Sequence, residues 1–153
     1  MMPQTDMFET IKLSQLRDWN INVFEIEDLF PYVYGMFKDY DLFSQFEIPL
    51  DGFRNFLEEI KTLYSKNGNP YHNWIHGFSV LQATYNLLCS TPAGDLFDVL
   101  DIFALLIASL CHDADHSGRN NSFEVNKGSA LAIQYNDVSV LENHHAAMTF
   151  LTI

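Results

Sequence analysis

The chain has 153 residues, of which 48% are hydrophobic, and this length and composition suit one domain with a buried core. Its 20 acidic and 8 basic residues give a formal net charge of −12. Because such a charge repels phosphate backbones and anionic lipid, we expect neither a nucleic-acid partner nor a membrane partner.

Two helices are predicted in the first half of the chain. Apolar residues recur at three- and four-residue steps across positions 27–40, which indicates a helix with one buried face and with Pro31 in its first turn. A second helix is predicted to be capped by Asp51 and to end at the Asn-Gly-Asn-Pro sequence of residues 67–70. Its inward residues are expected to be Phe53, Phe56, Leu57, Ile60 and Leu63.

Further helices are predicted at about 71–88, at about 96–111 and from residue 139 to the end, with short segments between the last two. Alternation of apolar and polar residues is nowhere sustained over a strand length. We therefore predict an all-α fold.

The two cysteines, Cys89 and Cys111, lie in apolar runs and are expected to be buried thiols. Residues 1–11 lack the pattern of an export signal, and the longest apolar run, 102–111, is too short to cross a bilayer. These features favour a reducing, cytoplasmic location.

The histidines are the main chemical signal. All six lie beyond residue 70, in three pairs: His72 with His76, His112 with His116, and His144 with His145. Residues four apart on a helix share a face, so His72 and His76 can serve one site, one as a metal ligand and the other toward substrate. Imidazole and carboxylate ligands together suit zinc, whereas a site of carboxylate and water suits magnesium or manganese.

Two of these histidines occupy particular positions. His112 and Asp113 fall at the carboxyl end of an apolar helix, where both side chains can face a cleft. Glu142 and His145 share a face of the last helix and can orient waters or metal ligands without binding the metal themselves. His144 points about a hundred degrees away from His145, so we leave it out of the site.

Three blocks carry a family resemblance: Asn-Pro-Tyr-His-Asn-Trp-Ile-His at 69–76, Cys-His-Asp-Ala-Asp-His-Ser-Gly at 111–118, and Tyr-Asn-Asp-Val-Ser-Val-Leu-Glu-Asn-His-His at 135–145. In their order and intervals they resemble the class I 3′,5′-cyclic nucleotide phosphodiesterases. The resemblance implies a compact helical array of the histidine-aspartate hydrolase type. It divides the chain into leading helices (1–68) and metal-site helices (69–153) of a partial catalytic domain.

The resemblance also implies roles for individual residues. His72 matches the general acid, and both His72 and Asp113 would meet the substrate. The matches to the zinc ligands are His76, His112 and Asp113, and Asp113 would also bridge to a second cation, magnesium or manganese. The residues expected to orient the metal ligands, without binding metal themselves, are His116, Glu142 and His145.

The implied reaction is hydrolysis of cAMP, cGMP or both to nucleoside 5′-monophosphates. A cyclic phosphodiester repels hydroxide and has a poor leaving group. Two cations would offset the charge repulsion, and a protonated His72 would donate a proton to the leaving oxygen. The family takes a further zinc-ligand aspartate and its base-binding residues from later helices, which the sequence does not contain. We therefore expect a truncated domain with weak or no activity by itself, and an exposed apolar face that another chain can cover.

Two alternatives stay open at this point. One is another metal-dependent phosphohydrolase of the histidine-aspartate type, although the block containing Glu142 and His145 is not required by such a site. The other is a non-catalytic helical fragment that binds a partner through its apolar face. Product analysis separates the first from a cyclic nucleotide phosphodiesterase, and metal titration with sedimentation separates the second.

Overall fold

The computed structural model describes residues 11–153, and the expectation for an export signal lies almost wholly outside them, in residues 1–10. Every regular element among the described residues is a helix, and none of these residues forms a strand. This confirms the predicted all-α class.

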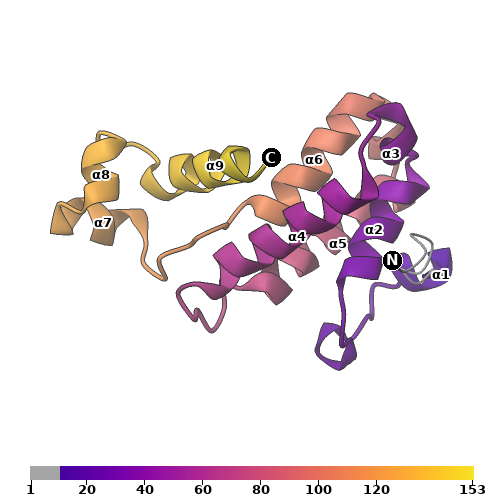
Figure 1. Ribbon diagram of the computed structural model, residues 1–153, viewed down its shortest axis with the longest axis horizontal. Coiled ribbons are helices and arrows are strands. Elements are labelled where there is room, and N and C mark those ends of the chain that lie inside the picture. Colours follow the sequence, from indigo (N-terminus) through magenta and orange to yellow (C-terminus); the bar gives the residue numbers. More distant parts are fainter. Residues whose placement is uncertain (1–10) are drawn as a thin grey trace.

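The helices follow one another with short connections (Figure 1). The first half contains α1 (Leu13–Leu16), the 3₁₀ helix η2 (Val23–Glu25), α2 (Phe30–Asp39), α3 (Leu42–Gln45) and α4 (Leu50–Ser65). The second half contains α5 (Trp74–Ser90), the 3₁₀ helix η3 (Pro92–Leu96), α6 (Val99–Cys111), α7 (Asn121–Lys127), α8 (Ala130–Gln134) and α9 (Val140–Thr152).

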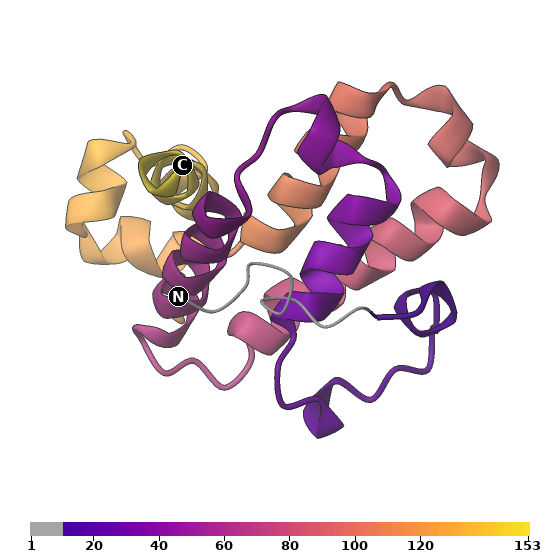
Figure 2. The ribbon, with the colours of Figure 1, turned by 45° about the vertical axis from the view of Figure 1, so that its right-hand side comes forward.

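Helix α5 lies at the centre of the molecule and packs against α2, α4 and α6. The largest side chains sealed between these helices are aromatic: Tyr64, Tyr85, Phe37 and Phe78. Burying such a side chain stabilises the fold by about 1.5–3 kcal/mol, so this core fixes the relative positions of the helix ends. Helix α9 returns from the α7–α8 side to pack against α4 and α6 (Figure 2).

The predicted helices are present, but their starts differ from the predictions. The prediction that Asp51 caps the second helix was wrong, because α4 begins at Leu50 with Pro49 as its N-cap. Asp51 lies instead in the first turn, where a carboxylate interacts favourably with the helix dipole. Helix α5 begins at Trp74 rather than residue 71, because the Asn73 side chain caps it.

The cysteines differ from each other in burial. Cys111 is buried as expected, whereas Cys89 is only half-buried, with its Sγ atom 3.4 Å from the hydroxyl of Tyr40. Both thiols are free. Within residues 11–153 there is no helix with the length and apolar character needed to span a bilayer.

Candidate metal centre

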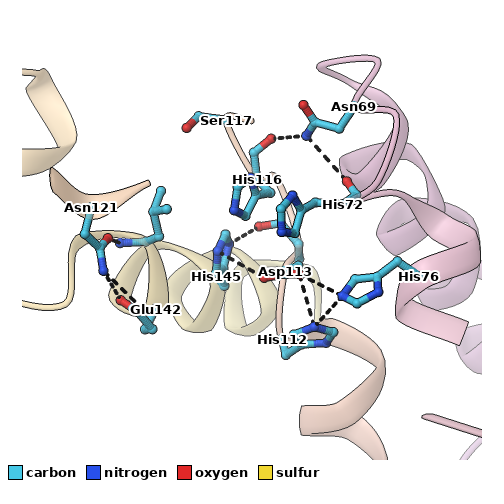
Figure 3. A network of polar contacts seen from close by, with 12 residues as sticks. Asn69, His72, His76, His112, Asp113, His116, Ser117, Asn121, Glu142 and His145 are labelled. Carbon is cyan, nitrogen blue, oxygen red and sulfur yellow. Dashed lines mark hydrogen bonds and ion pairs between the residues drawn. The ribbon is translucent and has the colours of Figure 1, made fainter. Parts of the chain in front are cut away.

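Residues distant in sequence meet where α5 begins, α6 ends and α9 passes. His76 lies in the first turn of α5, and the Asn73 side chain accepts hydrogen bonds from the backbone N–H groups of Ile75 and His76 at 3.1 and 3.2 Å. His112 is the C-cap of α6, and Asp113 follows it. The helix termini thus bring imidazoles and a carboxylate together (Figure 3).

His76, His112 and Asp113 form the first donor group. The two Nε2 atoms of the histidines are 3.1 Å apart, and the Asp113 Oδ2 atom lies 3.2 Å from that of His76 and 3.1 Å from that of His112. A tetrahedral zinc ion with ligands at about 2.0–2.1 Å holds its ligand atoms about 3.3 Å apart. The spacing of the three atoms therefore fits one such cation.

Hydrogen bonds determine which ring nitrogens face the centre. The Nδ1 atom of His112 is 2.9 Å from the Ser109 carbonyl oxygen, and that of His145 is 2.7 Å from the Ala114 carbonyl oxygen. A carbonyl only accepts, so each Nδ1 carries a proton and donates it. In the neutral rings, Nε2 then has a free lone pair that can bind a cation.

At neutral pH the pKa shifts of Asp113 and His76 favour ligation, whereas the pKa shift of His112 opposes it. Burial alone would raise the pKa of Asp113, but the hydrogen bond and charge of His112 outweigh it and lower this pKa to about 2. Burial lowers the pKa of His76, and the nearby His112 adds to this effect. The hydrogen bond to Asp113 raises the pKa of His112. Asp113 is therefore a carboxylate and His76 a neutral imidazole.

Asp113, His116 and His145 form the second donor group, whose candidate ligand atoms lie within 4.8 Å of one another. The Oδ1 atom of Asp113 is 3.7 Å from Nε2 of His145, so its two oxygens face different groups. The Nδ1 atom of His116 accepts a 2.9 Å hydrogen bond from the Gly118 N–H, so the neutral ring carries its proton on Nε2. His116 can therefore donate to a cation-bound water.

His72 lies at the edge of both groups. Its ring stacks on that of His116, with centroids 3.9 Å apart and planes 6° apart, and its centroid is 5.8 Å from that of His76. The His72 side chain is half-buried and so is partly accessible to solvent. His72 is thus adjacent to the donor groups without belonging to either.

Glu142 is the one residue of the predicted set that lies apart from both donor groups. It is exposed, and its carboxylate accepts hydrogen bonds of 3.0 and 3.2 Å from Asn121 (Figure 3). These bonds lower the pKa of Glu142. Glu142 is a member of neither donor group.

Sequence reasoning missed three residues that contact the site. Tyr64 donates from its hydroxyl to the Leu110 carbonyl at 2.9 Å and accepts from the Asp113 N–H at 3.2 Å. His144, which the helix geometry excluded from the site, lies 2.9 Å from the buried carboxylate of Asp115. The acid-histidine alternation in residues 112–116 was the only signal available for Asp115.

Comparison with known proteins decides the family. Residues 71–153, more than half of the chain, match the family described as 3′5′-cyclic nucleotide phosphodiesterase. The chain belongs to this family. Its matched region contains both donor groups and His72.

This member of the phosphodiesterase family is similar to curated proteins from distantly related organisms. It is 43% identical over 150 residues to the 3′,5′-cyclic-nucleotide phosphodiesterase regA of Dictyostelium discoideum, covering 97% of this chain and 19% of that protein. It is 36% identical over 144 residues to the human dual specificity calcium/calmodulin-dependent 3′,5′-cyclic nucleotide phosphodiesterase 1C, covering 90% and 20%. The chain thus spans about a fifth of the length of these relatives.

Solved phosphodiesterase structures share the fold. The phosphodiesterase domain of the RhoPDE fusion protein from the choanoflagellate Salpingoeca rosetta matches with a TM-score of 0.84 and 38% identity, over 92% of this chain and 44% of that one. A second structure of the phosphodiesterase domain of Salpingoeca rosetta rhodopsin phosphodiesterase gives a TM-score of 0.85 at 39% identity, over 92% and 42%. These matches confirm the predicted helical array of the phosphodiesterase type.

Proposed function

We propose that this chain supplies the cation-binding and proton-donating groups for hydrolysis of 3′,5′-cyclic nucleotides to nucleoside 5′-monophosphates. The observation that carries the proposal is the position of Asp113. Its Oδ2 atom faces His76 and His112, while its Oδ1 atom faces His145. A carboxylate that turns one oxygen to each donor group is suited to bridge two cations.

The donor chemistry differs between the groups. Two imidazoles and a carboxylate oxygen at tetrahedral spacing favour zinc in the first donor group. The second donor group offers one carboxylate oxygen, the His145 imidazole and a His116 N–H that can hold a water, which favours a more hydrated cation such as magnesium or manganese. Cations held there would acidify a bound water and neutralise charge on phosphoryl oxygens.

The protein's own part in the reaction is positioning and proton transfer. Asp113 and His145 stay fixed because backbone groups and Tyr64 hold them. His72, at the edge of the site, is the group we assign as proton donor to the departing 3′ oxygen. Such general-acid catalysis typically contributes about 10²–10⁴-fold in rate.

The proposal also covers the partners and the cellular location of the protein. The substrate partner is an anionic cyclic nucleotide, and no nucleic acid is expected beside a surface with a net charge of −12. Two free thiols are consistent with a reducing, cytoplasmic location. In this proposal residues 69–153 are the metal-site part of a partial catalytic domain, and residues 1–68, of which the structure describes 11–68, are its leading part.

A single-turnover assay tests the proposal. Excess zinc- and magnesium-loaded chain is mixed with labelled cAMP or cGMP, and the products are separated. We expect slow formation of the 5′-monophosphate, which chelation abolishes and His72→Asn lowers by about 10²-fold or more while zinc uptake is unchanged.

Two results would overturn the proposal. One is that the folded chain takes up neither zinc nor magnesium. The other is that turnover is the same in His72→Asn as in the unsubstituted chain. Release of inorganic phosphate instead of a monophosphate would favour another metal-dependent phosphohydrolase.

A further inference from the structure

The turn formed by residues 112–118 carries His112, Asp113 and His116, yet it is not a regular helix. Within it, Asp115 has a left-handed backbone, with φ of 58°. Such a conformation costs a non-glycine residue of order 1 kcal/mol, and contacts from outside the turn can offset this cost. Those contacts come from two elements distant in sequence.

Two basic side chains from different elements contact the Asp115 carboxylate. Just beyond α4, Lys66 places its Nζ atom 3.0 Å from Oδ1 and 3.1 Å from Oδ2, with the hydrogen bond directed to Oδ2. From α9, His144 places its Nε2 atom 2.9 Å from Oδ2. The Asp115 side chain is only 9% exposed, so this linkage has a buried centre.

Neighbouring contacts reinforce the same attachment. Asn67 and Asn69, in the loop between α4 and α5, both donate to the carbonyl oxygen of His116, at 2.9 and 2.7 Å. On the other side, His145 of α9 donates to the Ala114 carbonyl. The turn is therefore attached to the α4–α5 loop on one side and to α9 on the other.

We propose that Asp115 is a positioning residue that sets the geometry of the second donor group by joining Lys66 and His144. The second donor group needs this linkage, because His116 lies in the turn and His145 lies on α9. The first donor group depends on it less, because His76 and His112 are fixed by the ends of α5 and α6 and the Asp113 N–H is held by Tyr64. This inference rests on the proposed function, since it concerns the second cation of the same site.

The energetics favour the buried part of the linkage. Lys66 is 57% exposed, and an exposed ion pair by itself contributes little. The His144 and Asp115 side chains are 13% and 9% exposed, so loss of this partner leaves a carboxylate buried with poorer compensation. Changing either buried residue should therefore move the turn relative to α9 more than changing Lys66.

Sequential cation binding tests the proposal without using turnover. Zinc uptake is measured first with a competing indicator, and Mn²⁺ binding to the zinc-loaded chain is then followed by electron paramagnetic resonance. For Asp115→Asn we expect Mn²⁺ affinity to fall about 10–100-fold, as is typical for residues that orient ligands, with zinc affinity changed less than about 3-fold. The matched control is Asp137→Asn, an exposed aspartate with φ of 63°, which should change neither.

His144 variants keep the test decisive if Asp115→Asn folds poorly. His144→Leu removes the donor, whereas His144→Gln retains an N–H close to the position of Nε2. We expect Leu to reproduce the selective loss of Mn²⁺ binding and Gln to restore most of it, with unchanged helical circular dichroism.

The outcomes distinguish this inference from the proposed function. An unsubstituted chain that binds neither cation would contradict the proposed function. If the unsubstituted chain binds both, equal weakening of zinc and Mn²⁺ by His144→Leu, or no weakening of either, would overturn the role of Asp115 while leaving the proposed function intact.

Discussion

At the scale of single residues, Tyr64 connects the core to the metal centre. Its side chain is fully buried, and its hydroxyl is hydrogen-bonded to the Leu110 carbonyl and the Asp113 N–H. One side chain of α4 therefore fixes both the end of α6 and the backbone of Asp113.

We expect Tyr64→Phe to lower the free energy of unfolding by about 1–3 kcal/mol, because two buried backbone groups lose their partner while the packing is kept. Urea unfolding measures this. Tyr71→Phe, on an exposed ring, is the matched control and should stay within about 0.5 kcal/mol. A similar small change for Tyr64→Phe would show that the hydroxyl contributes little.

The two thiols should differ in reactivity. Burial raises the pKa of Cys111 to about 12, and this residue is 2% exposed, whereas Cys89 is half-buried. At pH 8 we expect a thiol reagent to modify Cys89 in the folded chain and Cys111 only on unfolding, because the thiolate is the reactive form. Cys89→Ser and Cys111→Ser variants show which thiol reacts in the folded chain and which reacts only on unfolding.

The raised pKa of Cys111 also sets a pH dependence of stability. The unfolded thiol titrates near its ordinary value of 9.0, so the folded chain holds this proton more tightly. Its contribution to stability is complete below pH 9 and is lost as the pH rises from about 9 toward 12. The urea midpoint should fall in this range, and should fall less in Cys111→Ala; an equal fall in both would assign the effect to other groups.

At the scale of helices, two glycines should respond in opposite ways to the same substitution. Gly52 lies exposed in α4, and an added Cβ atom would approach only Pro49, at 3.9 Å. Gly77 lies in α5, where an added Cβ would be 2.8 Å from the Tyr64 ring. Gly77 is therefore the position that lets α5 approach α4 beside the metal centre.

We expect Gly52→Ala to stabilise the chain by about 0.5–1 kcal/mol through better helix propensity. Gly77→Ala should destabilise it by about 1–3 kcal/mol, because the ring of Tyr64 must move. Thermal or urea unfolding of the two variants measures both signs. Stabilisation by Gly77→Ala would show that α5 has more room beside the Tyr64 ring than a 2.8 Å approach allows.

The sequence was informative about helices and local motifs for a physical reason. Periodicity predicted the buried faces of α2 and α4. The motif around His76 and the motif around Asp113 each lie within a few consecutive residues, so each can be recognised from the local sequence. Lys66 and His144 contact Asp115 across 49 and 29 positions, and periodicity contains no information about such contacts. His144 was excluded because helix geometry places it away from His145, although it faces the turn that carries His116.

At the scale of the whole molecule, apolar side chains cluster at the end of α9. Phe150, Leu151 and Ile153 are 78%, 80% and 76% exposed. Beside Ile153 lies an apolar groove of about 360 Å³ that Phe53 and Phe103 help to line. Together these features favour contact with another chain, in line with the exposed apolar face expected from the sequence.

We therefore expect the chain to self-associate at micromolar concentration, despite its net charge of −12, and Leu151→Glu to shift it toward monomer. Sedimentation velocity at two concentrations measures this. Gln134→Glu, an exposed change at the end of α8, is the control for one added negative charge. A chain that sediments as a monomer at every concentration would contradict the expectation.

The central claim is that His76, His112 and Asp113 hold one cation. Zinc-edge X-ray absorption of the zinc-loaded chain tests it most directly. We expect about one tightly bound zinc with nitrogen and oxygen neighbours at about 2.0–2.1 Å, including two imidazoles, and the loss of one imidazole in His112→Ala. A spectrum that His112→Ala leaves unchanged, or a folded chain that binds no zinc, would contradict it.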